Sequence, residues 1–310
     1  MRSLSIHMEL FKLTTEQRNR NSMNLDQMSV GQMIKLINEE DKKVALAVEK
    51  VLPQVETAIE ATHKALKKGG RIFYVGAGTS GRVGVMDASE CPPTFMTSPD
   101  MVQTVMAGGN NAFFQAVEGS EDHEAKGETD VKDKGVTKKD VVFGITASGR
   151  TPYPIGALKY ARKLGAYTVS LSCNDNSVIS QFADCSIEVV VGPEILTGST
   201  RMKAATAHKM ILNMISTAVM VKLGKVYENL MVDVHASNYK LKERAKTNIM
   251  EITKVSYEKA EEVLKQTNHE VKPAIVMIEA DVSVEEAKAA IDNNNGFVRR
   301  AIDYFTEKPH

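Results

Sequence analysis

The chain of 310 residues contains no tryptophan, only three cysteines and no excess of either charge. Its 39 Lys and Arg balance its 39 Asp and Glu, so no global basic field favours nucleic acid as the main partner. Cys91, Cys173 and Cys185 form no CxxC pair, which argues against a disulfide framework and a zinc site. No apolar run approaches the ~20 residues of a membrane helix. We therefore expect a cytoplasmic protein with buried thiols, no metal site and no membrane partner.

The first 60 residues predict an arm followed by helices. Residues 1 to about 23 lack a clean hydrophobic period, and Ser29 to Gln32 then fits a capping box, S-x-x-Q. Apolar residues at three- and four-residue steps from Val44 to Leu66 predict a long helix, which Pro53 kinks or restarts. The pair Gly69-Gly70 ends this pattern.

Residues 61–225 change to short apolar runs separated by helix-like stretches such as Pro154 to Leu164. The runs are Ile72–Val75, Val102–Met106, Val141–Ile145, Tyr167–Leu171 and Ile187–Val191. Strands that alternate with helices predict an α/β fold with a parallel sheet, and near-continuous apolar strands predict helices on both of its faces. A helix from Met202 to Leu223 follows. Its stripe of Met210, Met214, Thr217 and Val221 is typical of a side that faces the core.

The remaining residues predict a helical connector over 226–250 and a C-terminal three-helix domain over 251–310. The three helices are Ser256–Gln266, Lys272–Glu279 and Ser283–Phe305, and the last begins with a good capping box and is broken by Asn293-Asn294-Asn295-Gly296. A bundle of this size needs to pack on another part of the protein to be stable.

The first apolar run leads into Gly76-Ala77-Gly78-Thr79-Ser80-Gly81, formally a G-x-G-x-x-G pattern that opens a helix. Glycines let the backbone approach a ligand, and a helix N-terminus favours an anion. A dinucleotide site would also need an acidic residue after the second strand, but Asp100 precedes that run. The hydroxyls of Thr79 and Ser80 instead suit a terminal phosphate, and a glycine turn used only for packing is the alternative.

Two further clusters of hydroxyl side chains open helices. Ser148 and Thr151 follow the third apolar run, and Thr197 to Lys203 precedes the long helix. In the second cluster the hydroxyls could cap the helix, or they and the cations Arg201 and Lys203 could meet a ligand. Because the carboxyl ends of parallel strands share one edge, these turns can converge on one phosphorylated small molecule. His208 is then either a pocket residue or an ordinary helix histidine.

Two carboxylate clusters could carry acid–base chemistry. Glu90 precedes Pro92-Pro93, which predict an extended exit and a sharply defined corner, whereas for Asp87 a salt bridge or cap is preferred. Glu118 and Glu121 lie in a second cluster. The sequence has no metal-ligand spacing and no nucleophile elbow, so proton transfer by carboxylates is the economical chemistry.

Five stretches of the chain resemble the N-acetylmuramic acid 6-phosphate etherases, members of the sugar isomerase (SIS) domain superfamily that are related to the glucokinase regulatory protein. The stretches are YVGAGTSGRVGVMDASECPPTF, AVEGSED, ASGRTPY, TGSTRMKAATA and GKVYENLMVDV. The likeness runs from about Asn24 to Ala301. GTSGR alone marks only a phosphosugar-binding domain, whereas DASECPPTF together with STRMKA is far more specific. The chain departs from the family at Ala205, His208 and Asp175-Asn176, which bears on fine substrate preference and not on the class.

The resemblance implies an SIS-type fold and cleavage of the D-lactyl ether of N-acetylmuramate 6-phosphate, giving N-acetylglucosamine 6-phosphate and D-lactate. It implies no cofactor, and a homodimer with a shared active site. Glu90 would protonate the departing lactate and then activate water, and Glu121 would be the second catalytic glutamate. Phosphate contacts would come from Thr79, Ser80, Ser148 and Thr151, with Gly78, Ser199, Arg201, Lys203 and His208 as further pocket candidates.

Two other functions remain open at this point. A non-catalytic phosphosugar sensor would bind the same ligand without turnover and regulate a partner. A phosphosugar isomerase would share the loops and a carboxylate base.

Overall fold

The computed structural model describes residues 12–233 and 239–306, and the chain divides into two compact units. The first unit comprises Met1–Ala88 and Asp100–Ser216, and the second comprises Ser89–Pro99 and Thr217–His310. Within the described ranges, no helix combines the length and the hydropathy that crossing a membrane requires.

A five-stranded parallel sheet in the order β2-β1-β3-β4-β5 forms the centre of the first unit. The strands are β1 Ile72–Gly76, β2 Val102–Met106, β3 Val141–Ile145, β4 Tyr167–Ser172 and β5 Cys185–Glu188. The sequence predicted all five, but it started the last one two residues too late and ended it three residues too late. The strand β5 ends at Glu188 because its neighbour β4 ends at Ser172, whose carbonyl accepts the N–H of Val189.

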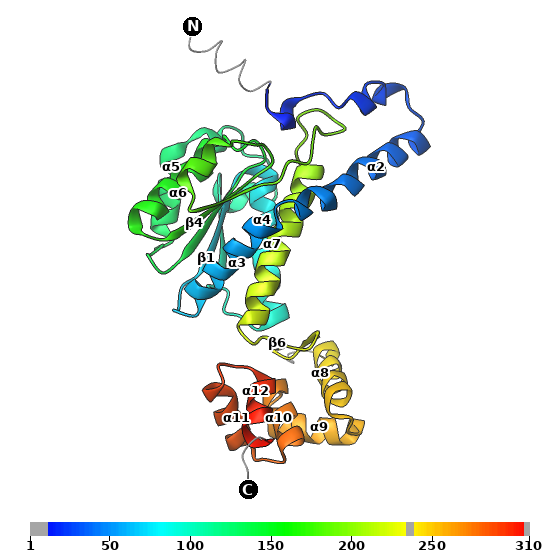
Figure 1. The fold of residues 1–310 in the computed structure, drawn as a ribbon, viewed down its shortest axis with the longest axis vertical. Helices are drawn as coiled ribbons and strands as arrows, with labels where there is room; N and C mark the ends of the chain where they lie inside the picture. Colours follow the sequence, from blue (N-terminus) through cyan, green and yellow to red (C-terminus); the bar gives the residue numbers. More distant parts are fainter. Residues whose placement is uncertain (1–11, 234–238, 307–310) are drawn as a thin grey trace. The chain divides into compact units, whose positions relative to one another are not determined.

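Helices cover both faces of this sheet, as the apolar strands predicted (Figure 1). The helices α5 (Glu124–Asp133) and α6 (Pro152–Leu164) lie on one face. On the other lie α3 (Leu52–Leu66), α4 (Gly78–Phe95) and α7 (Lys203–Lys222). The core on the α5 and α6 side joins Phe73 and Val75 of β1 to Tyr153 and Leu158 of α6, all of them buried.

The N-terminal segment forms short 3-10 turns before its first long helix. These turns are η1 Thr14–Glu16, η2 Arg20–Ser22 and η3 Leu25–Gln27. The helix α2 (Val30–Glu49) then starts with the predicted capping box between Ser29 and Gln32. A separate helix α3 starts at Leu52 with Pro53 in its first turn, so the predicted restart is confirmed.

The prediction of an extended exit at Pro92-Pro93 was wrong. Both prolines lie inside α4, which continues to Phe95. A proline φ is compatible with a helix, so the pair removes N–H donors without imposing an extended backbone. The helix stops where Met96 adopts a left-handed φ of 52° and donates its N–H to the carbonyl of Pro92.

The predicted core face of α7 was also wrong, by about one residue. Met210 and Met214 are only half-buried, and Thr217 and Val221 are exposed. The buried stripe has the same spacing and contains Ala204, Ala207, His208, Ile211, Leu212, Ile215 and Val219. Both stripes are largely apolar, so the periodicity of the sequence alone does not choose between them.

The second unit contains a small helical bundle and a short hairpin. Its helices are α8 Tyr239–Thr253, α9 Tyr257–Gln266, α10 Val271–Ala280, α11 Val284–Asn293 and α12 Val298–Thr306, and the hairpin strands are β6 Val226–Tyr227 and β7 Leu230–Met231. The capping box between Ser283 and Glu286 is present. The third predicted helix is two helices, because Asn295 and Gly296 both adopt positive φ.

Candidate active site

The strands β1 and β3 are neighbours at the point where the order in which the chain adds strands to the sheet reverses. The chain passes from β1 to β2 on one side and then returns to β3 on the other. Gly76 pairs with Ile145, so the turns that follow these two strands leave the sheet side by side. In open parallel α/β sheets ligands bind at such a carboxyl edge. The fold thus brings the turn with Thr79 and Ser80 next to the turn with Ser148 and Thr151.

The turn after β1 opens helix α4 at Gly78, whose φ is 52°. A Cβ on Gly76 would lie 2.8 Å from the backbone nitrogen of Gly81, so only glycine allows this close approach of strand and helix. Thr79 is half-buried and Ser80 is 9% exposed. The N–H groups in the first turn of a helix lack helical acceptors, and they can bind an anion.

The turn after β3 gathers three hydroxyl groups. The Oγ1 of Thr146 lies 2.7 Å from Oγ1 of Thr151 and 3.2 Å from Oγ of Ser148. A Cβ on Gly149, whose φ is 72°, would lie 2.1 Å from Oγ of Ser177, so this position requires glycine. Thr151 precedes α6 without capping it. The uncapped helix and the three hydroxyls make a polar cradle suited to an anion. Thr146 was missed in the sequence, although it directly follows the strand.

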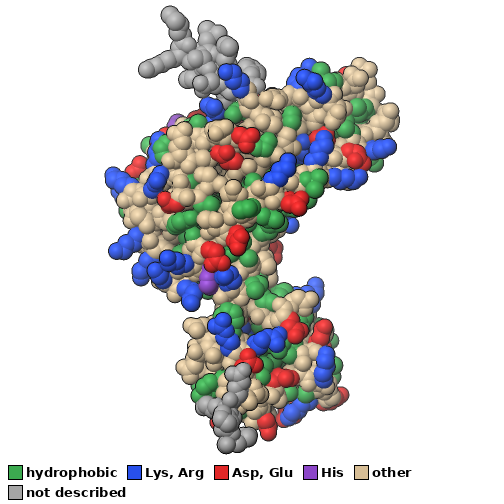
Figure 2. Space-filling model, in the orientation of Figure 1, with side chains coloured by type: hydrophobic (Ala, Val, Ile, Leu, Met, Phe, Trp, Pro, Cys, Tyr) green, Lys and Arg blue, Asp and Glu red, His purple; other side chains and the backbone are tan. Residues whose placement is uncertain are grey.

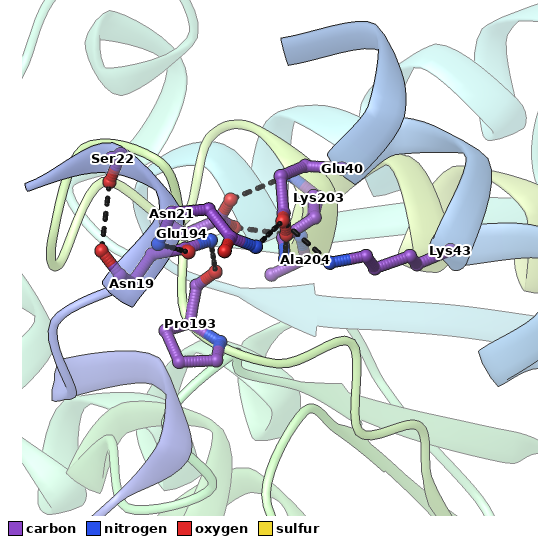
Figure 3. A network of polar contacts seen from close by, with 9 residues as sticks. All are labelled: Asn19, Asn21, Ser22, Glu40, Lys43, Pro193, Glu194, Lys203 and Ala204. Carbon is purple, nitrogen blue, oxygen red and sulfur yellow. Dashed lines mark hydrogen bonds and ion pairs between the residues drawn. The ribbon is translucent and has the colours of Figure 1, made fainter. Parts of the chain in front are cut away.

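In the third hydroxyl cluster, Thr197 to Lys203, the predicted cap of α7 is supplied by another residue (Figure 3). The N-terminus of α7 is capped by the carboxylate of Glu194, which accepts the N–H groups of Lys203 at 3.1 Å and Ala204 at 3.0 Å. The hydroxyls before the helix therefore do not cap it. The Nζ of Lys203 is buried and lies 2.7 Å from Oε2 of Glu40, in α2. The Lys203 ammonium is thus held by this carboxylate, whereas Ser199 is half-buried and Arg201 is exposed.

The two buried carboxylates of this network differ in their pKa. Burial alone would raise the pKa of Glu40, but hydrogen bonds from Lys203, Lys43 and Asn21 outweigh it and lower the pKa from 4.5 to about 2. Burial raises the pKa of Glu194 above its usual value. The hydrogen bonds from the backbone N–H groups of Lys203 and Ala204 and the positive charge of Lys203 lower this pKa, but burial has the larger effect. Glu40 is consequently the charged partner of Lys203 at neutral pH.

Glu121 lies in the first unit on an exposed 3-10 turn, η5 (Ser120–Asp122). Gly119 enters this turn with a φ of 71°, and the turn packs against α6. Arg82 of α4 donates to the carbonyls of Phe113 and Gln115, both at 3.3 Å. These bonds connect the segment before η5 to α4, the helix that begins at the turn after β1. Glu121 is therefore presented to solvent by a turn anchored to α6. Glu118 is exposed as well.

Glu90 is an exposed residue of α4 and belongs to the second unit. In the described part of the chain, neither Glu90 nor Glu121 has an ion-pair or hydrogen-bond partner. Both carboxylates are thus accessible for proton exchange with a ligand.

Comparison with known proteins decides the family. The chain is 56% identical over 302 residues to the N-acetylmuramic acid 6-phosphate etherase of Bacillus subtilis, a match that covers 97% of this chain and 99% of that protein. It is 50% identical to the etherase of Clostridium beijerinckii, again over 97% and 99%. The chain belongs to the N-acetylmuramic acid 6-phosphate etherase family. This membership confirms the enzyme class that the sequence predicted, a carbon–oxygen lyase of amino-sugar metabolism.

Domain models give the same result for the fold. Residues 116–218 match the SIS domain, and residues 54–162 match the N-terminal SIS domain of the glucokinase regulatory protein. The predicted SIS-type parallel sheet with flanking helices is confirmed. Among solved structures, a phosphoheptose isomerase from Neisseria gonorrhoeae is similar with a TM-score of 0.49 and 18% identity, over 62% of this chain and 99% of that one.

The two departures from the family pattern in α7 are both buried. His208 is fully buried, with Nε2 3.4 Å from Sγ of Cys173, and burial lowers its pKa to about 4. It is therefore neutral at pH 7 and lies in the core of this etherase-family chain, as an ordinary helix histidine would. Ala205 is 9% exposed.

Asp87 has a structural position, as the sequence favoured. It is 4% exposed and accepts hydrogen bonds from the hydroxyl of Tyr74 at 2.9 Å, from Asn213 at 2.7 Å and from Ser216 at 2.9 Å. These bonds join β1, α4 and α7. Asp87 thus helps to fix the helix that begins at the first phosphate-type turn.

Proposed function

We propose that this chain cleaves the D-lactyl ether of N-acetylmuramic acid 6-phosphate by elimination and hydration, giving N-acetylglucosamine 6-phosphate and D-lactate. The observation that carries the proposal is the near-full-length identity to curated etherases, 56% over 97% of the chain. The structure supports it, because the hydroxyl-lined turns lie side by side at the sheet edge of the first unit, and the carboxylates of Glu90 and Glu121 are each exposed to solvent.

The phosphate of the substrate would be held by neutral donors. The hydroxyls of Thr79, Ser80, Ser148 and Thr151 come from two adjacent turns, each at the start of a helix. Backbone N–H groups and the helix dipoles favour a phosphate dianion there. Such a site needs no basic surface, which agrees with a net charge of zero.

The reaction needs two acid–base groups. In the open-chain sugar, the aldehyde at C1 acidifies the proton on C2, and Glu121 removes it. The electron pair forms the C2–C3 double bond as the C3–O bond breaks, and Glu90 donates a proton to the departing lactyl oxygen. Glu90, now a carboxylate, takes a proton from the water that adds to C3, and Glu121 returns a proton to C2. One water is consumed, and both glutamates regain their starting states.

The direct test is an enzyme-coupled assay for D-lactate with N-acetylmuramic acid 6-phosphate. We expect lactate and N-acetylglucosamine 6-phosphate in equal amounts. Binding of the sugar phosphate without lactate would instead indicate the sensor. Interconversion of aldose and ketose phosphates without lactate would indicate the isomerase.

Glu121→Gln tests the proposed base. General acid–base groups contribute about 10²- to 10⁴-fold to a rate, so we expect kcat to fall within that range. Exchange of the C2 proton with deuterium oxide, followed by NMR, should fall in parallel. Glu118→Gln is the matched control, since Glu118 is equally exposed and three residues away. The assignment is wrong if Glu118→Gln loses activity and Glu121→Gln keeps it.

We further propose that the chain acts as a homodimer with a shared active site. The first half of α2 is amphipathic, yet none of its residues 30–39 is buried. Its apolar Val30 and Ile34 are 73% and 61% exposed. Exposed apolar patches of this kind mark interaction surfaces, and a second copy of the same chain is the commonest partner.

Ile34→Asp should therefore convert the dimer to a monomer in light scattering at micromolar concentration, with loss of activity. Lys35→Asp, on the adjacent exposed residue, should leave the dimer intact. A wild-type chain that scatters as a monomer would refute the dimer.

We place the reaction in the cytoplasm, in the recycling or catabolism of cell-wall amino sugars. Cys91, Cys173 and Cys185 are all buried free thiols, which suits a reducing compartment. Cell fractionation with an antibody against the protein would check this location.

A further inference from the structure

The N-terminal arm, defined as residues Leu13 to Ser22, is packed onto the first unit. Leu13, Thr15 and Asn19 are 8%, 1% and 6% exposed. This segment has no clean hydrophobic period, and several polar contacts hold it in place. Its partners are loops at the carboxyl ends of the strands, where the phosphate-type turns lie.

Asn174 connects the arm to the turn that carries Ser148. Its Oδ1 accepts the N–H of Thr15 at 3.3 Å, and its Nδ2 donates to Oγ1 of Thr15 at 3.1 Å. The same Nδ2 lies 3.1 Å from the carbonyl of Ala147 and 3.3 Å from that of Ser148. Asn174 is 2% exposed, so this amide forms a buried bridge between the arm and the polar cradle.

A second set of contacts fixes the arm to the loop before α7 and to α2 (Figure 3). Asn19 donates to the carbonyl of Pro193 at 3.1 Å, and Asn21 donates to Oε1 of Glu40 at 3.0 Å. The carboxylate of Glu16 lies 3.5 Å from where a Cβ on Gly198 would be. The arm thus lies close to the loop before α7 at Gly198, and it reaches the turn with Ser148 through Asn174.

We propose that the N-terminal arm is part of the phosphosugar site, with Thr15 and Asn174 as positioning residues for the turn that binds the phosphate. This inference rests on the proposed function of that turn. Holding the carbonyls of Ala147 and Ser148 sets the direction of the Ser148 hydroxyl and of the backbone that follows. Misplacement of a binding group by about 1 Å can cost up to about 100-fold in rate, so such a buried bridge has a functional consequence.

Thr15→Val tests the bridge, because valine keeps the buried volume and removes the hydroxyl. The Thr15 hydroxyl also donates to Oε1 of Glu16 at 3.1 Å, within the arm itself. We expect KM for N-acetylmuramic acid 6-phosphate to rise about tenfold with kcat changed less than about threefold, as loss of the hydrogen bond from Asn174 predicts. Thr15→Ser should restore KM. Thr14→Ala is the matched control, since the Thr14 hydroxyl makes no hydrogen bond with a described residue.

A second substrate separates positioning from general damage to the fold. With N-acetylmuramic acid, which lacks the phosphate, Thr15→Val should have the same kcat/KM as the wild type. Equal losses on both substrates, or an unchanged KM on the phosphorylated one, would overturn the inference.

Calorimetric binding of N-acetylglucosamine 6-phosphate gives a test that does not depend on turnover. The dissociation constant should rise about tenfold in Thr15→Val and return in Thr15→Ser. An unchanged constant would overturn the inference even if the wild type releases no lactate. Absence of lactate from the wild type, by contrast, would refute only the proposed function.

Discussion

Glu90→Gln should abolish the release of D-lactate almost completely, with kcat lowered by about 10³-fold or more. Glu90 is assigned two proton transfers, to the departing lactyl oxygen and from the incoming water, and each such group contributes about 10²- to 10⁴-fold. Glutamine has the same shape but cannot donate or accept that proton. Glu90 is exposed, so the substitution should change the free energy of unfolding by less than about 0.5 kcal/mol.

Proton exchange at C2 distinguishes the roles of the two glutamates. Glu90→Gln should still exchange this proton in deuterium oxide, because Glu121 remains available as the base. Glu121→Gln should lose both exchange and lactate release. The opposite pattern would mean that the two roles are interchanged, and full activity of Glu90→Gln would exclude it from the chemistry.

Lys203→Met should produce the largest loss of stability, about 3 kcal/mol in urea unfolding. Lys203 and Glu40 are 2% and 3% exposed, and their charged atoms lie 2.7 Å apart. Removing one partner leaves a buried carboxylate whose remaining partners, among residues 12–233 and 239–306, are Lys43 and Asn21. Lys209→Met is the control. Lys209 is exposed on the same helix, and a substitution there should change stability by less than about 0.5 kcal/mol.

The double variant Glu40→Leu with Lys203→Met should be more stable than Lys203→Met alone, because it removes the unpaired charge. Acid should weaken the wild type in the same way. The pKa of Glu40 is lowered from 4.5 to about 2 in the folded state, so its stabilisation is complete above pH 4.5 and is lost as the pH falls toward 2. Additive single and double variants would show that the pair makes no coupled contribution.

Local patterns in the sequence predicted most of the fold. The capping boxes at Ser29 and Ser283 appear at the helix starts that they indicated. Their signals are local, because a cap or a left-handed turn depends on a few neighbouring residues. The alternation of strands and helices, which predicted a parallel sheet, can also be read from short stretches of the sequence. The prediction of an extended exit at Pro92-Pro93 was wrong because proline restricts φ without forbidding a helix.

The candidate site was predicted only in part. Thr79, Ser80, Ser148 and Thr151 were singled out because glycine-rich turns after apolar runs have a recognisable pattern, and the structure places their two turns side by side. Lys203 was considered only as a cation near the ligand, and its buried ion pair with Glu40 was not foreseen, because this pair joins residues 163 positions apart. Asn174 and Thr15 were not singled out for a similar reason, because their hydrogen bonds span 159 positions.

The sequence by itself determined most of the elements, the glycine-dependent turns and the family of etherases to which the chain belongs. The tertiary structure alone decided which stripe of α7 is buried, that Lys203 is neutralised by Glu40, and that the N-terminal arm reaches the turn with Ser148 through Asn174. The physical reason is the separation along the chain over which each interaction acts. Propensities, caps and turns act over a few residues, whereas burial and ion pairing depend on which distant segments the sheet brings together.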